Sequence, residues 1–462
     1  MRATRFIFLA AALLSAASAA AQDSAGAGPN PFAKIGHIVV IVTENRSFDH
    51  VFGLFPGAEG LEAAARAHPQ IDRDGHALPY LPIPGQEFRP PNAPFLLKGA
   101  LAGPEKIDPV HQFYVEQEQI NGGRMDQFVE ASNAGGLVMG YRDARSSQQW
   151  RLAQQFTLAD HFFHPAFGGS MLNHVFLVCG CAPVYPDAPK ELVSELDGKG
   201  RLARADSSPE SALRGAPRWR NVGKVTPDGF AVGTFLPFAP LGPVPSDGDR
   251  LPAQTAPTIG DRLSEKDIRW AWYAGGWADV ASGRSRPYEG ADKFQSHHQP
   301  FAYFKNYGPG TSAHAEHLKD GADFIEDARK GTLPPVSFYK PVGRYNEHPA
   351  YADFDAGDAH LGAIVDQLQA SPNWSDMLIV VVADENGGFW DHVSPPKIDR
   401  FGPGTRIPAL VISPFARKGF IDTTVYDGSS ILRTIEVRFG LEPLTARDAA
   451  ATDLRSALKP PR

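Results

Sequence analysis

An uninterrupted apolar run, residues 377–383, ends abruptly in two acids, Asp384 and Glu385. The run is rich in β-branched residues and is followed by Gly387 and Gly388, a pattern typical of a strand buried on both faces of a parallel sheet. Open α/β sheets bind ligands beyond the carboxyl ends of their strands. The pattern therefore predicts an α/β fold with two carboxylates at the edge of the sheet where a site forms.

A second apolar run, residues 37–43, repeats this arrangement and leads into Glu44 and Asn45. Each acid alone would be read as a surface or capping residue, but buried carboxylates without a partner are costly. Carboxylate and amide oxygens are the ligands that a hard cation prefers. The two strand ends therefore predict one metal site, assembled by folding from Glu44, Asn45, Asp384 and Glu385.

The composition is that of a globular protein with many loops. Apolar residues make up 42% and charged residues 21% of the 462 residues, so wholesale disorder is excluded. The 45 glycines and 41 prolines indicate ordered loops rather than a helical bundle. The formal net charge of −7 provides no basic field, and no nucleic acid binding is expected.

Residues 1–21 have the pattern of a secretory signal peptide. Arg2 and Arg5 precede a short apolar stretch, which ends in three alanines. Because the arginines are not adjacent, a Sec-type rather than a twin-arginine route is expected. The first stretch is too short to span a membrane, and no later one is apolar for the roughly 18 residues that a span needs. We therefore expect a periplasmic or secreted protein without stable membrane insertion.

Cys179 and Cys181 are the only cysteines. Export permits a disulfide, whereas a bridge across a single residue closes a small, strained ring. The sequence leaves open whether the two form a bridge or remain core thiols. They are too few for a zinc site.

Strand and helix patterns alternate along the chain after a loose, flexible leader at residues 22–34. Strands are expected at 156–163, 267–274, 336–340 and 407–414, and helices at 146–155, 170–178, 359–369 and 429–439. This alternation predicts a central, mostly parallel β-sheet with helices on both faces. Proline-rich stretches near 66–105 and 183–256 are interpreted as irregular insertions in a single domain that spans residues 35–462.

Ser170 is a candidate nucleophile. Gly168 and Gly169 permit a sharp turn, and Ser170 stands where the next helix should begin, so helix N–H groups and the helix dipole can stabilise an alkoxide and a phosphate there. A plain N-cap serine is the alternative. Leu172 occupies the position where the nucleophile elbow of serine esterases needs glycine, and the motif of a nucleotide-binding phosphate loop is absent.

Several loop histidines are candidates for phosphate contacts and for proton transfer. They are His111, His297, His298, His348 and His392. A loop histidine is most often structural, yet imidazole is the natural group to bind phosphate oxygens or to protonate a leaving oxygen near neutral pH.

Three longer segments together identify a resemblance. Residues 43–50, 167–170 and 384–393 resemble the bacterial phosphoesterase family that includes acid phosphatase AcpA and the phosphatidylcholine-type phospholipases C. Residues 297–301 and 407–414 look like further family stretches. The resemblance extends from about residue 35 to residue 441.

The resemblance implies an alkaline phosphatase-like α/β fold and one metal ion, which is calcium, magnesium, manganese or iron. The implied ligands are Glu44, Asn45, Ser170, Asp384 and Glu385. Ser170 is then also the nucleophile and forms a phosphoserine intermediate. Asn45, His111, His348 and His298 contact the phosphate, and the three histidines transfer protons, although the sequence leaves open whether His297 or His298 faces the site.

A small-molecule phosphomonoester is the expected substrate, cleaved in an acid phosphatase reaction. The Gly168-Gly169-Ser170 turn is closer to the acid phosphatase branch, and the chain shows neither a twin-arginine signal nor an added C-terminal domain. Phospholipase C is the first alternative, and a non-catalytic binding protein on the same fold is the second. Sulfate ester hydrolysis is disfavoured because Ser170 lacks the Pro-x-Arg pattern of sulfatases. The oligomeric state stays open.

Overall fold

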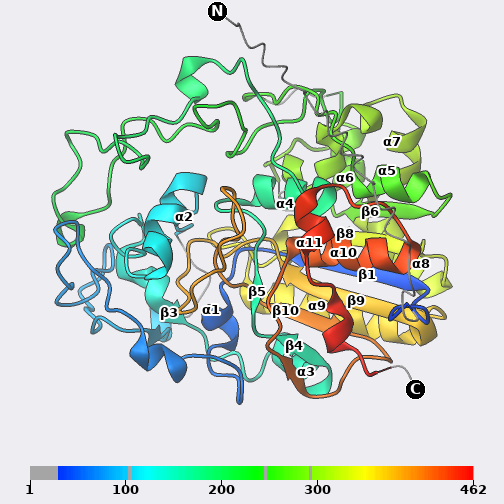
Figure 1. Ribbon diagram of the computed structural model, residues 1–462, viewed down its shortest axis with the longest axis horizontal. Helices are drawn as coiled ribbons and strands as arrows, with labels where there is room; N and C mark the ends of the chain where they lie inside the picture. Colours follow the sequence, from blue (N-terminus) through cyan, green and yellow to red (C-terminus); the bar gives the residue numbers. More distant parts are fainter. Residues whose placement is uncertain (1–29, 102–106, 244–246, 291–293, 461–462) are drawn as a thin grey trace, which may run out of the picture. The chain divides into compact units, whose positions relative to one another are not determined.

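Two apolar strands lie side by side at the centre of the computed structural model, which describes residues 30–101, 107–243, 247–290 and 294–460. Strand β1, His37–Thr43, pairs in parallel with β9, Met377–Ala383, along its whole length. Nearly all their side chains are buried. The two runs that dominate the sequence therefore form the middle of the core (Figure 1).

The central sheet has eight strands. Their order is β11 (Phe420–Asp422), β4 (Thr157–Ala159), β10 (Ala409–Ile412), β9, β1, β8 (Val336–Lys340), β6 (Trp270–Ala274) and β7 (Leu318–Asp320). Only the pairs that β10 makes with β4 and β9 are antiparallel among the described strands of this sheet. The carboxyl ends of β1, β8 and β9 consequently meet at one edge.

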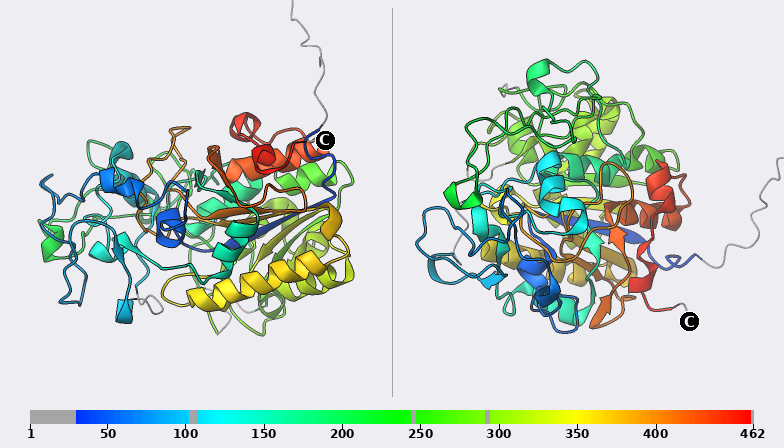
Figure 2. Two further views of the ribbon diagram at one scale, coloured as in Figure 1. Left: turned by 90° about the horizontal axis from the view of Figure 1, so that it is seen from below. Right: turned by 60° about the vertical axis from the view of Figure 1, so that its left-hand side comes forward.

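Helices cover both faces of the sheet. Helix α9, Phe354–Ala370, lies on one face and α10, Gly428–Phe439, on the other (Figure 2). Helices α3, Gln148–Gln155, and α8, Gly321–Lys330, pack beside α9, whereas α4, Ser170–Cys179, packs beside α10. The expected α/β fold, with a mostly parallel sheet between two helical layers, is confirmed.

The remaining elements are short. They are the helices α1 (Phe48–Phe52), α2 (Phe113–Ile120), α5 (Ile259–Ser264), α6 (Trp277–Ala281), α7 (Ser312–His317) and α11 (Ala446–Ala450), and the strand pairs β2 (Phe95–Leu96) with β3 (Gly140–Tyr141) and β5 (Phe162–Phe163) with β12 (Tyr426–Asp427).

The prediction of one strand over residues 156–163 is wrong, because the chain turns at Asp160 and His161 and forms β4 and β5 instead. The Asp160 carbonyl accepts a hydrogen bond of 2.8 Å from Arg406 and so leaves the ladder. The strand expected from residue 267 begins only at Trp270, since Asp267 has a φ of +54°.

The proposed insertions contain little regular structure among their described residues. Between 183 and 256 the chain forms two short 3₁₀ turns and isolated bridges. Leu78, Leu81 and Ile83 of the first insertion are buried in a small apolar cluster with Phe128. Both stretches are therefore ordered by packing rather than by a ladder.

The predicted signal peptide at residues 1–21 and most of the predicted leader lie outside the described residues. Residues 31–462 form one compact unit, in which Phe32 is fully buried. The ordered body thus includes the last residues of the predicted leader. In the described part of the chain, no helix combines the length and the apolarity that crossing a membrane requires.

A buried ion-pair network holds the segment that follows β9. The Arg406 guanidinium contacts Asp391 at 3.1 Å and Asp49 of α1 at 3.1 Å, and all three side chains are at most 2% exposed. The Asp391 carboxylate also accepts a hydrogen bond of 3.0 Å from the Asp49 amide. The network ties α1, which follows β1, to the loop that carries Asp384.

Arg406→Met should destabilise the fold by about 3–5 kcal/mol, because it removes the guanidinium that pairs with both buried carboxylates and leaves only His392 beside Asp49. Urea and thermal unfolding followed by circular dichroism measure the loss. Arg145→Met is the control, since the Arg145–Asp143 pair lies at the surface and its loss should leave the midpoint unchanged. Equal midpoints for Arg406→Met and wild type would show that the network is not required.

Candidate active site

Three strand ends bring acidic and basic side chains to one edge of the sheet. Thr43 of β1 is paired with Ala383 of β9, so Glu44 and Asp384 emerge next to each other. The neighbouring strand β8 ends in Lys340, which is fully buried. The backbone amide of Asn45 donates a hydrogen bond to Asp384 Oδ1 at 3.3 Å. This bond joins the end of β1 directly to the end of β9.

Ser170 is the first residue of α4, and it is 7% exposed. The turn before it requires glycine at position 168, where φ is +88° and a Cβ atom would stand 2.5 Å from the Phe113 nitrogen. The Asn173 side chain donates hydrogen bonds to the carbonyls of Gly168 and Gly169 at 2.9 and 3.1 Å. The turn thus presents the hydroxyl at the N-terminus of α4 in a fixed position.

The Ser170 hydroxyl lies against the predicted ligands. Its Oγ is 3.2 Å from Glu385 Oε1 and 3.5 Å from Asn45 Oδ1. The His111 Nε2 atom lies 3.3 Å from the same Glu385 oxygen and 3.5 Å from Asn45 Nδ2. Asn45 adopts a φ of +50°, a left-handed conformation that is uncommon outside glycine and often found at functional sites.

Glu44 lies on the opposite side of this cluster, among imidazoles and the lysine. Its Oε1 atom is 2.5 Å from His298 Nε2 and 2.7 Å from Lys340 Nζ. Its Oε2 atom is 3.8 Å from His348 Nε2. The His174 Nδ1 atom lies 3.5 Å from Asp384 Oδ2. The cluster therefore has an oxygen-rich side at Ser170 and an imidazole-rich side at Glu44.

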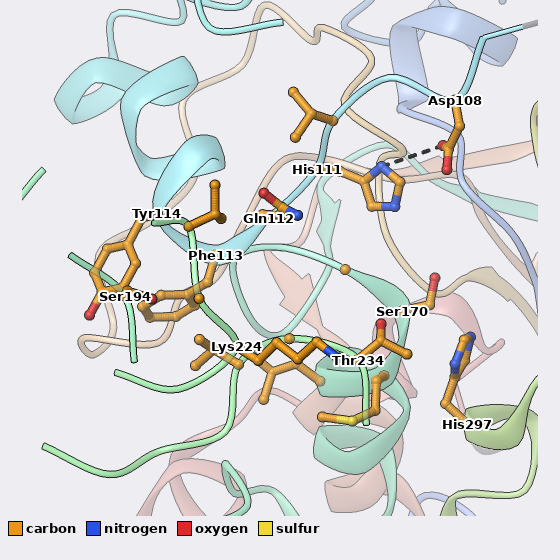
Figure 3. A pocket seen from close by; sticks show the side chains of 18 of the residues that line it. Asp108, His111, Gln112, Phe113, Tyr114, Ser170, Ser194, Lys224, Thr234 and His297 are labelled. Carbon is orange, nitrogen blue, oxygen red and sulfur yellow. Dashed lines mark ion pairs between the residues drawn. The ribbon is translucent and has the colours of Figure 1, made fainter. Parts of the chain in front are cut away.

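Ser170, His111 and His348 line one cavity of about 470 Å³, as does His297 (Figure 3). Figure 3 shows the Ser170, His111 and His297 side chains around this space. His298 lies behind it, against Glu44. The structure thus brings together the implied metal ligands, Ser170 and the implied phosphate-contacting histidines, and it places His297 rather than His298 in the cavity lining. The candidate His392 lies apart from them, against Asp49 of α1.

Sequence reasoning missed two residues of the cluster, namely Lys340 and His174, and left open whether His297 or His298 faces the site. Lys340 is the one charged residue of the strand expected at 336–340, a position that signals either an exposed edge or a site. His174 stands four residues after Ser170 on the same helix face, which is the spacing that brings two side chains together.

Burial and mutual repulsion shift the pKa values of the carboxylates. Burial, only partly offset by His111, raises the pKa of Glu385 to about 8. Burial also raises the pKa of Asp384 above its ordinary value. Glu44 is buried too, but Lys340 and His298 hold its pKa well below the ordinary value. The protein alone supplies too little positive charge for three ionised carboxylates.

Burial also lowers the pKa values of the imidazoles, and the charged groups beside each imidazole decide whether its pKa ends above or below the ordinary value. Burial opposes the charge on His111, but the Glu385 and Asp108 carboxylates outweigh it and raise the pKa of His111 to about 9. Burial lowers the pKa of His298 to about 4, despite the nearby Glu44 carboxylate. His111 is therefore charged at neutral pH, whereas His298 is a neutral nitrogen donor.

The donor set fits a metal ion. Buried atoms without an aligned hydrogen-bond partner include Glu44 Oε1, Asp384 Oδ2, His298 Nε2 and both ring nitrogens of His297. Ligand atoms of Glu44, His297 and His298 lie within 4.8 Å of one another. Asp49, Asp391 and His392 form a second such group, but Arg406 already pairs with both of its carboxylates. The strand-end cluster is thus the better candidate for a metal centre.

Glu44→Gln and Asp384→Asn should each lose bound metal together with activity, because each removes one anionic oxygen from a buried cation site. Metal content of the purified variants, measured by inductively coupled plasma mass spectrometry, checks this. Glu436→Gln is the matched control, because Glu436 is an equally buried carboxylate in α10, outside the cluster. Stoichiometric metal in either site variant would remove that residue from the set of ligands.

Comparisons with known proteins agree over nearly the whole chain. The profile of the Phosphoesterase family matches residues 35–442. A non-hemolytic phospholipase C of Pseudomonas aeruginosa is 24% identical over 92% of this chain, which spans only 57% of that protein's length. Phospholipase C B of Mycobacterium tuberculosis is 26% identical over 97% of this chain and 82% of its own length.

Solved structures give a weaker match. An alkaline phosphatase superfamily protein from Vibrio parahaemolyticus aligns with 78% of this chain and 72% of its own, with 14% sequence identity and a TM-score of 0.34. The fold assignment rests on the strand order and directions described above.

Proposed function

Because the chain belongs to the Phosphoesterase family, we propose that it is a metal-dependent hydrolase of phosphoric esters with Ser170 as its nucleophile. The observation that carries this proposal is the position of the Ser170 hydroxyl. It stands at the start of α4, in a cavity, 3.2 Å from Glu385, whose carboxylate can receive its proton when a cation bound in the cluster keeps Glu385 ionised. A plain N-cap serine would have no need of such neighbours.

The reaction that fits this geometry has two displacements. The Ser170 oxygen bonds to phosphorus while the ester bond breaks, and the hydroxyl proton passes to Glu385. Water then attacks the phosphoserine and releases inorganic phosphate, and Ser170 regains a proton. A divalent cation in the cluster would offset the phosphate charge and favour the ionised serine.

His111 is the best placed general acid. It lines the cavity beside Ser170, and it carries a proton at neutral pH because its pKa is about 9. The leaving oxygen takes this proton as the ester bond breaks. His348 and His297 also line the cavity and supply phosphate contacts, together with the side-chain amide of Asn45.

Oxygen and nitrogen donors together restrict the choice of metal. Calcium and magnesium prefer oxygen ligands alone, whereas imidazoles beside Glu44 suit iron, and manganese accepts both. We therefore place iron and manganese ahead of calcium and magnesium.

A phosphomonoester is our first candidate substrate, and the activity is then that of an acid phosphatase. The Gly168-Gly169-Ser170 turn supports this, as does a cavity whose lining is partly polar and whose volume suits a small molecule. The Cys179–Cys181 disulfide supports a periplasmic or secreted location.

Phospholipase C activity is the second candidate, and the names of the curated relatives favour it. Phe113, Leu172 and Val232 give the cavity an apolar wall that a lipid could contact. This activity needs a membrane-docking surface as well, and a net charge near −7 would be repelled by anionic bilayers.

Ser170→Ala should lower turnover at least about a thousandfold and leave the fold intact, because a bound water is a far slower nucleophile. Steady-state assays with p-nitrophenyl phosphate measure this, and acid quenching followed by mass spectrometry should detect phosphoryl-Ser170 in the wild type. Ser429→Ala, a buried serine in the first turn of α10, is the control. A rate above about a tenth of wild type would refute the assignment of the nucleophile.

Substrate class is tested by comparing two rates on one enzyme preparation. Release of p-nitrophenol from p-nitrophenyl phosphate should exceed release of diacylglycerol from phosphatidylcholine vesicles from mildly acidic to neutral pH, because His111 is charged over this whole range. Faster release from vesicles would assign the protein to the phospholipase C branch and leave the Ser170 mechanism untouched.

A further inference from the structure

Lys340 carries a positive charge into the centre of the site. It ends β8 at the same edge where β1 and β9 end, and its side chain is fully buried. The ammonium lies 2.7 Å from Glu44 Oε1 and 3.5 Å from the Thr43 carbonyl oxygen. A buried ammonium is strongly unfavourable unless it has an anionic partner, so its position beside Glu44 constrains both groups.

The charges of the cluster define what Lys340 contributes. Glu44, Asp384 and Glu385 bring three carboxylates into one buried space. Their other close contacts include the imidazoles of His111, His174 and His298, which are charged only when protonated. A lysine ammonium, by contrast, is a compact point charge on a flexible stem. The Lys340 ammonium therefore balances the charge of one of the three carboxylates and leaves the charge of the others to the metal ion and to His111 beside Glu385.

We propose that Lys340 is a built-in cation of this site, which balances one buried carboxylate, holds Glu44 in place and limits the site to a single divalent ion. The proposal rests on the metal binding proposed above and adds a cause for the single ion that the family resemblance implies. Lys340 is here a positioning and charge-balancing residue, since it acts through Glu44 and the cation.

Metal binding to the full-length protein tests the role of the charge. Wild-type protein, stripped with a chelator and titrated with Mn²⁺ by calorimetry and equilibrium dialysis, should bind one ion per chain. Lys340→Met keeps the length of the side chain and removes its charge. Because the ammonium then no longer repels the metal ion, this variant should bind the first ion at least tenfold more tightly or take up a second one.

A double variant separates charge from structure. Glu44→Gln alone should bind Mn²⁺ weakly, because the ammonium then faces one carboxylate fewer. Adding Lys340→Met removes the unbalanced cation and should restore affinity at least tenfold over Glu44→Gln. The double variant also replaces the ion pair by neutral groups, so it avoids a lone buried charge. Thermal unfolding of each variant confirms that it is folded.

The opposite order of affinities would overturn the proposal. If Lys340→Met binds Mn²⁺ more weakly than wild type and the double variant is no better than Glu44→Gln, Lys340 serves only to hold the fold. Two ions per wild-type chain would also refute the limit to a single ion. If wild-type protein binds no metal under any condition while Ser170 still forms phosphoserine, this inference and the metal requirement fail together, but the nucleophile stands.

Discussion

Three buried carboxylates at the end of two neighbouring strands are the constraint on which the rest of the structure depends. Glu44, Asp384 and Glu385 are at most 5% exposed, and like charges in such a space repel one another strongly. The surrounding imidazoles, the lysine at the end of β8 and the proposed metal ion would each reduce that repulsion. The sheet fixes the carboxylates, because residues paired in register along β1 and β9 cannot separate without breaking the ladder.

The position of Ser170, the proposed nucleophile, depends on a second buried arrangement, which lies outside the carboxylate cluster. The Glu116 side chain accepts hydrogen bonds from the Gly168 amide at 2.5 Å and from the Thr405 amide at 2.9 Å, and it contacts His164 at 2.8 Å. The turn before Ser170 is thereby held from α2 and from the segment that precedes β10. Because buried polar groups are costly without partners, this arrangement favours one geometry of the turn.

Local patterns in the sequence predicted the features that depend on neighbouring residues in the chain, namely the two central strands and the polar residues directly after them. The apolar runs predicted β1 and β9, and the residues directly after them predicted Glu44, Asn45, Asp384 and Glu385 as neighbours, because parallel strands end at a common edge. Nothing local distinguishes His297 from His298, since a 3₁₀ turn places one in the cavity and the other against Glu44. Lys340 was missed because its burial depends on Glu44, nearly three hundred residues earlier in the chain. The break between β4 and β5 depends on Arg406, which is equally remote.

The hydrogen bond between Asn45 and Asp384 joins residues that are 339 positions apart. Closing so long a loop costs conformational entropy before any contact is gained, so pairing of β1 with β9 is expected late in folding. During synthesis, β1 cannot pair with β9 until most of the chain has emerged, and β9 is the neighbour with which β1 pairs over the greatest length. An incomplete chain therefore cannot form the active site, which requires the completed sheet.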